Sequence, residues 1–319
     1  MKRLSFLAMF VAMVLSASAQ YKMQVWMNGT PLTLSVAKID SVTFEDENPT
    51  PNIPEPDPNP DPSTANGIGV FSVAKGKTVT FSPGNLQYTQ STNTWSFAEN
   101  QWEMIGTDNV TGGSVSSGEN GDSKEGTALA DKVDLFGWST NTTNFGVSTS
   151  TDDEDYSGSF VDWGTNKIGN DVPNTWRTLT YEEWNYLLRK RPNYSELCGV
   201  AQVNGVNGLI FLPDNWTCPA GVTFKSGFHS SYGVEYYVAY QTFTGDQWSE
   251  LESTGAVFLP AAGYRYGSVV GYVQHSGTYW SAPEVDSNDA YGLTFFSVGA
   301  SMTKYYRCLG LSVRLVKDL

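Results

Sequence analysis

Hydrophobic and polar residues alternate over short runs through most of this chain, and turn-forming residues separate the runs. FSVAKGKTVTFSPGNLQY alternates on both sides of a Lys-Gly-Lys turn between Val73 and Thr78, and TNTWSFAENQWEMIG follows in the same style. Near the C-terminus GAVFLPAAGYRYGS, GTYWSA, DAYGLTFF and LSVRLVKDL repeat the pattern. A period of two predicts strands that bury one face. In the last run we therefore expect Leu311, Val313 and Leu315 to face the core. The outward positions would be Ser312, Arg314 and Lys317.

One segment, NTWRTLTYEEWNYLLRKR at residues 174–191, has the period of a helix instead. Thr180 and Glu183 form a capping box, in which the hydroxyl and the carboxylate satisfy each other's backbone N–H groups. The apolar face would hold Trp184, Leu187 and Leu188. Lys190 and Arg191 complement the dipole at the C-terminal end, and Pro192 stops the helix.

A second segment, TGDQWSELESTG, follows the same rules. Thr244 and Gln247 form its capping box, Trp248 and Leu251 its apolar stripe, and Gly255 its C-terminal cap. Two short helices among many strands predict an α+β domain with a mixed or antiparallel sheet.

The N-terminus predicts export. MKRLSFLAMFVAMVLSASAQ combines two basic residues, an apolar run from Leu4 to Leu15 and an Ala-Ser-Ala cleavage signal, so residues 1–19 read as a signal peptide. A membrane anchor is the weaker reading because the run is shorter than the ~20 residues that span a bilayer. No later segment is apolar enough to span. We expect an extracellular, cell-surface or periplasmic protein.

Two small segments precede the main domain. Residues 20–46 read as a β-hairpin around Asn28-Gly29, a dipeptide favoured in tight turns. Residues 47–66 are rich in Pro, Asp and Asn and predict an extended linker. The α+β domain would then span residues 67–319. Within it, residues 107–131 and 139–160 are rich in Gly, Ser, Thr, Asn and Asp and should be long surface loops.

Composition narrows the range of binding partners that we expect. The formal net charge is −14, which makes nucleic acid and anionic membranes poor partners. The three cysteines leave two readings of about equal weight in an oxidising compartment. Cys198 and Cys218 flank a segment that could fold back as a hairpin and bring them together. Alternatively, all three cysteines, Cys308 included, are unconnected buried thiols.

Several of these pieces resemble a known family. WRTLTYEEWNYLLRKR is similar to the helix motif of formylglycine-generating-enzyme-type proteins, and GLSVRLV at 310–316 looks like their closing strand. The C-terminal segments are more similar to secreted bacterial paralogues of the major-paralogous-domain type and to variable proteins diversified by retroelements. The resemblance implies a C-type-lectin-like fold over residues 67–319, with two helices beside a central sheet and the last strand next to the first. It also implies that Trp184 and Trp248 are core residues.

The enzymatic branch of that family requires two cysteines near the last strands, and here Cys308 stands alone. As an independent nucleophile Cys308 would need a base, for which only His229 and His275 are available, with no spacing signal. A glycosidase pair could come from Glu284, Asp286 and Asp289, but nothing fixes their separation. The acidic run at 152–155 lacks the register of a calcium loop. We expect no catalytic residue, no cofactor and no metal site.

The remaining candidate site is an aromatic surface. Tyr offers a large rigid contact area, while Gly, Ser and Thr offer adaptable hydrogen bonding, a composition typical of binding loops. We expect a face that recognises an extracellular protein or glycan. Its residues would be Tyr264, Tyr266, Tyr272, His275, Tyr291, Phe296, Tyr305 and Tyr306. The alternatives are an enzyme of the formylglycine-generating or glycosidase type and a structural subunit of a surface appendage that exchanges strands through its hairpin.

Overall fold

The computed structural model describes residues 22–27, 30–35, 69–118, 120–138, 145–230, 239–284 and 288–319. The chain divides into two compact units, Met1–Asn59 and Pro60–Leu319. In the first unit β1 (Lys22–Met27) and β2 (Thr30–Ser35) pair antiparallel, as expected for the hairpin. The turn residues Asn28 and Gly29 lie outside the described residues. So do the segments assigned to the signal peptide and the linker.

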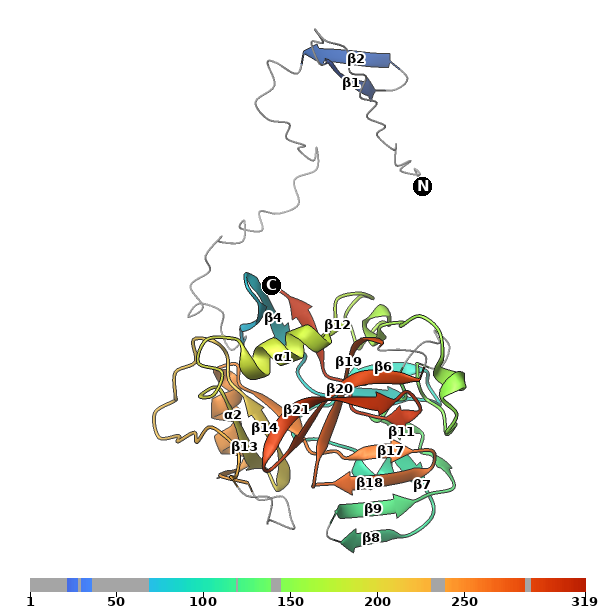
Figure 1. Ribbon diagram of the computed structural model, residues 1–319, viewed down its shortest axis with the longest axis vertical. Coiled ribbons are helices and arrows are strands. Elements are labelled where there is room, and N and C mark those ends of the chain that lie inside the picture. Colours follow the sequence, from blue (N-terminus) through green and yellow to red (C-terminus); the bar gives the residue numbers. More distant parts are fainter. Residues whose placement is uncertain are drawn as a thin grey trace. The chain divides into compact units, whose positions relative to one another are not determined.

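The second unit is a mostly-sheet α+β structure with several antiparallel sheets (Figure 1). Two four-stranded sheets run in the orders β12-β23-β4-β3 and β15-β13-β14-β16. A five-stranded sheet runs β22-β17-β18-β9-β8, three-stranded sheets run β11-β5-β6 and β19-β20-β21, and β7 pairs with β10. The pair of β13 with β15 is parallel.

The strand bounds are as follows: β3 Phe71–Ala74, β4 Lys77–Phe81, β5 Leu86–Thr89, β6 Thr94–Phe97, β7 Val110–Thr111, β8 Val115–Gly118, β9 Gly121–Glu125, β10 Ala128–Leu129, β11 Lys132–Val133, β12 Arg177–Thr178, β13 Cys198–Val203, β14 Val206–Phe211, β15 Thr242–Phe243, β16 Val257–Pro260, β17 Tyr264–Tyr266, β18 Val269–Val273, β19 Gly277–Glu284, β20 Asp289–Phe296, β21 Gly299–Tyr306, β22 Leu309–Gly310 and β23 Leu315–Asp318. The helices are α1 (Tyr181–Arg189) and α2 (Gly245–Ser253), with short 3-10 turns at Gly106–Asn109, Asp153–Tyr156 and Trp163–Thr165.

The end of the chain returns to the start of this unit. Val316 of β23 lies opposite Phe81 of β4, and Figure 1 shows the C-terminus beside β4. Val79, Phe81 and Val316 join one hydrophobic core cluster with Trp184 and Leu187 of α1. The last strand, β23, is therefore fixed to β4, and the first helix packs on the same cluster.

Both helices begin as their sequences predict. Thr180 and Glu183 exchange side-chain and backbone hydrogen bonds at the start of α1, and Thr244 and Gln247 do the same for α2. Trp184 and Trp248 are completely buried. Gly255, just after α2, has a φ of 86°, a conformation that favours glycine at a helix end.

The C-terminal end of α1 differs from expectation in one respect. Arg191 donates to the helix carbonyl of Leu187, at 3.1 Å, and it is also a core residue, only 1% exposed, which its charge alone did not indicate. It also donates to the carbonyls of Leu212 and Leu197 and forms an ion pair with Asp214. This arginine therefore joins α1 to the β13–β14 hairpin.

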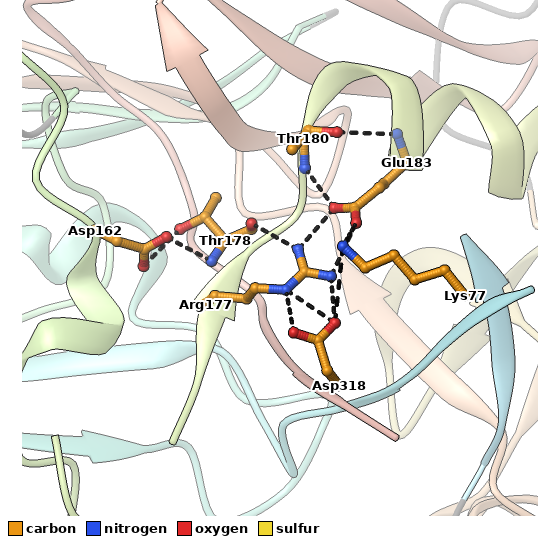
Figure 2. A network of polar contacts seen from close by, with 7 residues as sticks. All are labelled: Lys77, Asp162, Arg177, Thr178, Thr180, Glu183 and Asp318. Atoms are coloured by element: carbon orange, nitrogen blue, oxygen red, sulfur yellow. Dashed lines mark hydrogen bonds and ion pairs between the residues drawn. The ribbon is translucent and has the colours of Figure 1, made fainter. Parts of the chain in front are cut away.

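Figure 2 shows the network that anchors the other end of α1. Arg177 donates to both carboxylate oxygens of Glu183, at 2.7 and 2.8 Å, and to Asp318 of the last strand at 2.7–3.1 Å. Lys77 adds an ion pair to Glu183 at 2.8 Å. Burial favours a higher pKa for Glu183, but the hydrogen bonds from Arg177 and Lys77 outweigh it and hold the pKa below its usual value. The helix motif thus has a structural role.

Two expectations are wrong, one about secondary structure and one about exposure. Residues 107–131 are not simply a loop, because they contain the strands β7, β8, β9 and β10, and β9 pairs with β18. Ser312 and Arg314 do not face outward; they are 0% and 1% exposed. The segment that holds them is covered on both sides, since Ser312 bridges to β19 and Arg314 donates to Gln101 at 2.7 Å. Alternation predicts one buried face and fails where both faces are covered.

The proposed Cys198–Cys218 pair does not form. The predicted hairpin is present, but its register places Cys198 opposite Phe211, so the chain leaves the hairpin well before Cys218. All three cysteines are free, with Cys198 and Cys308 buried and Cys218 exposed. The alternative of three unconnected thiols is therefore correct, except that Cys218 is not buried.

Candidate functional site

Four aromatic side chains form a continuous series across two sheets. The ring of Tyr264 stacks on Tyr272 with centroids 5.2 Å apart and planes inclined by 21°. His275 follows at 5.9 Å from Tyr272, and Phe296 at 6.1 Å from His275. All four are partly or largely exposed. We call this set the aromatic strip; spacings of this size are those of favourable aromatic pairs.

Strand alternation explains why β17 presents its tyrosines. Tyr264 and Tyr266 share one face of the sheet because they are two residues apart. Arg265, between them, is completely buried on the other face and donates to the carbonyls of Gly267 and Leu135 at 2.8 and 3.4 Å. A buried arginine therefore fixes the strand from one side, while on the other side Tyr266 is exposed and Tyr264 is half-buried against a core cluster.

Tyr272, the next-to-last residue of β18, lies in an unusual backbone conformation where the register of that strand shifts. Tyr272 and Gln274 both have a φ of +64°, a left-handed conformation that is rare for bulky residues. The Tyr272 carbonyl accepts from the N–H groups of His275 and Ser276, each at 3.0 Å. Left-handed residues outside glycine store of order 1–3 kcal/mol and cluster at functional sites.

Hydrogen bonds from a neighbouring hairpin lock this turn. The Asn207 N–H donates to Gln274 Oε1 at 2.7 Å, and Asn207 Nδ2 donates to the Gln274 carbonyl at 2.9 Å. The Gln274 N–H in turn donates to the carbonyl of Ala261 at 2.8 Å. The strip is thus mounted on a rigid turn, which reduces the entropy lost when a ligand binds.

Tyr305 lies beside the strip but is more buried. Its hydroxyl pairs with Thr294 at 2.5 Å, and its ring meets Trp280 edge-on at 6.4 Å. A Cβ atom at Gly292 would lie 3.1 Å from the Tyr305 ring, so glycine there lets the ring lie across β20. Burial raises the pKa of Tyr305, and the nearby Tyr264 adds to the shift.

The other predicted residues are placed differently. Tyr266 is 47% exposed on the same sheet face as Tyr264. Tyr291 lies on the opposite face of β20, where its ring is 4.4 Å from that of Tyr181 in α1. Tyr306 follows Tyr305 in β21, so it points to the other side of that sheet, and it is 60% exposed. The structure therefore brings together six of the eight residues and separates Tyr291 and Tyr306 from them.

The strip is electrically neutral near pH 7. Burial lowers the pKa of His275 below its usual value, which favours the uncharged imidazole. Burial likewise raises the pKa of Tyr264, with a further contribution from Tyr272. The rings therefore offer apolar faces and neutral hydrogen-bonding groups.

Cys308, considered as a nucleophile, shows no activation. Burial and the neighbouring Asp153 raise the pKa of Cys308 to about 12, which disfavours a thiolate. The backbone N–H of Cys308 donates to Asp153 at 2.9 Å. For the glycosidase candidates, Asp286 and the side chain of Glu284 lie outside the described residues. Within the described ranges no cluster of three or more His, Cys, Asp or Glu residues is arranged to hold a metal ion.

Sequence reasoning identified the rings of this site but missed its support. Neither the left-handed backbone at Tyr272 nor the contact of Gln274 with Asn207 has a sequence signal, because the two segments are far apart in the chain.

Among the described residues, no helix combines the length and the apolar character needed to cross a membrane. Comparison with known proteins finds no match among family models, curated proteins or solved structures.

Proposed function

We propose that this protein is an exported, non-enzymatic binding protein that recognises an extracellular protein or glycan through the aromatic strip. The observation that supports this most is Tyr272, a bulky residue held in a left-handed conformation within a continuous series of partly exposed rings. A purely structural surface has no need to maintain such strain. Recognition would bury the apolar ring faces against a partner or stack them on sugar rings.

The fold that we propose for the second unit is C-type-lectin-like. Three features support it: two capped helices, a last strand that pairs with β4 near the start of the unit, and the Arg177–Glu183 contact within the helix motif. In the retroelement-diversified proteins that this chain resembles, the corresponding C-terminal segments contact the ligand. The signal-like N-terminus supports export from a bacterial cell.

The test is an array of extracellular glycans and proteins probed with the purified mature chain, with and without chelator. We expect binding that is lost in Tyr272→Gly and in Phe296→Ala. Tyr306→Ala serves as the matched control because Tyr306 is more exposed than either residue but points away from the strip. An unchanged binding profile in both strip variants would refute the proposal.

A further inference from the structure

A cleft of about 370 Å³ lies away from the aromatic strip. One wall is the pair Thr80 and Lys317, which face each other across β4 and β23. Another wall is the segment that carries Asp171 and Trp176, and the end of α2 contributes Glu252. No residue of the strip lines it. Its size is at the lower end for ligand sites, which suits a small ligand.

Both carboxylates in the cleft are positioned by one hydrogen bond each. Asp171 Oδ2 accepts from the indole N–H of Trp176 at 2.8 Å, and Glu252 Oε1 accepts from Gln101 Nε2 at 2.8 Å. Within the described ranges no other donor reaches either side chain, and Lys317 has no ion-pair partner. Each carboxylate therefore keeps an oxygen available to a ligand.

Buried groups hold Glu252 in place from behind. Gln101 is 4% exposed, and its Oε1 accepts from the Phe258 N–H at 2.8 Å and from Arg314 Nη2 at 2.7 Å. Because that oxygen faces two donors, the amide nitrogen must face Glu252. Arg314 is 1% exposed and contacts no carboxylate directly, so Glu252 compensates its charge through Gln101. The carboxylate is thus kept at the end of α2, where the helix dipole disfavours it.

The chemistry of the cleft selects among ligand classes. An anion would meet Asp171 and Glu252, a cation would meet the ammonium group of Lys317, and an apolar molecule would leave all three polar groups without partners. A neutral polyol can donate to the carboxylates and accept from the ammonium group. The half-buried Trp176 ring, packed edge-on against Phe97 at 5.3 Å, supplies an aromatic surface beside them.

We propose that this cleft is a second binding site, specific for one or two rings of a neutral saccharide. In it Asp171 and Glu252 accept hydrogen bonds from sugar hydroxyl groups, Lys317 donates one, and Trp176 contacts the ring. The site is separate from the aromatic strip, so either proposal can fail without the other.

The experiment is calorimetric titration of the full mature chain with glucose, galactose, mannose and N-acetylglucosamine, each also as a disaccharide. Glucosamine and glucuronate serve as charged probes. We expect at least one neutral sugar to bind more tightly than both charged probes. Asp171→Asn, at an exposed position, should weaken binding roughly tenfold, because a hydrogen bond to a neutral amide oxygen is weaker than one to a carboxylate. Trp176→Ala should weaken it as well.

Tyr306→Ala, which lies outside both the cleft and the strip, is the matched control and should leave the affinity unchanged. The proposal is overturned if none of the neutral sugars binds. It is also overturned if binding survives Asp171→Asn and Trp176→Ala but is lost in Phe296→Ala, because the strip would then be the sugar site. A folded state of each variant is verified by its thermal unfolding before titration.

Discussion

Replacing Tyr272 by glycine should remove a binding ring while relieving backbone strain. Tyr272 has a φ of +64°, where an L-residue with a side chain is disfavoured and glycine is not. Tyr272→Ala removes the same ring but keeps a Cβ atom in that conformation. The two variants lose the same stacking on Tyr264 and differ only in the backbone term.

The expected difference follows from two opposing effects. Relief of the left-handed conformation stabilises the glycine variant by about 1–2 kcal/mol relative to the alanine variant. The greater freedom of glycine in the unfolded chain offsets about 0.5–1 kcal/mol of that. Tyr272→Gly should therefore be more stable than Tyr272→Ala by roughly 0.5–1 kcal/mol, although both lack the ring.

Urea unfolding of both variants measures this difference directly, and a second pair calibrates it. Tyr266 also lies in this region but has an ordinary strand conformation, so Tyr266→Ala should be more stable than Tyr266→Gly by about 0.5–1 kcal/mol. If the glycine variant is the more stable at position 272 and the alanine variant is the more stable at position 266, the result supports strain at Tyr272. If alanine is at least as stable as glycine at both positions, Tyr272 stores no strain and the main support for the proposed site is lost.

Other predictions concern the residues that hold the fold together. Glu183→Gln should destabilise the fold by about 2 kcal/mol, since a charge-assisted contact is lost. Because the pKa of Glu183 is lower in the folded than in the unfolded state, its contribution to folding stability is complete above pH 4.5 and is lost as the pH falls through the folded-state pKa. The free energy of unfolding of the variant should therefore depend less on acidic pH than that of the original protein. Leu187→Ala should lower the free energy of unfolding by about 2–5 kcal/mol, and a loss under 1 kcal/mol would contradict the packing of α1. At neutral pH a thiol reagent should modify only Cys218 in the native protein and all three cysteines after unfolding. The reason is that burial raises the pKa of Cys198 and of Cys308 to about 12. Rapid modification of all three thiols in the native protein would contradict this prediction.

Local signals predicted the elements of this protein well. The capping boxes at Thr180 and Thr244 and the hairpin that begins at Cys198 are present, because a cap or a tight turn depends on residues close in sequence. The same reasoning placed Arg314 outside and missed the strands within residues 107–131. Their environment is set by distant partners: Gln101 reaches Arg314, and β18 pairs with β9.

The candidate site shows the same division. Composition identified an aromatic region, and the structure places most of its rings together. Which rings meet depends on sheet register, and a shift of one position decides that Tyr305 lies beside the strip while Tyr306 points away. The locked turn depends on Asn207, far from it in the chain, so no local pattern could have revealed it.

Within three residues, β17 holds one side chain that supports the fold and two that contribute to the surface, and this arrangement has a consequence for evolution. Arg265 satisfies carbonyls inside the protein, whereas the tyrosines lie on the other side of the strand, Tyr266 exposed and Tyr264 half-buried. Mutations that exchange the tyrosines would alter what the surface recognises while the internal support stays intact. Such a strand can accumulate new specificities at little risk to folding, provided that the arginine between them is kept.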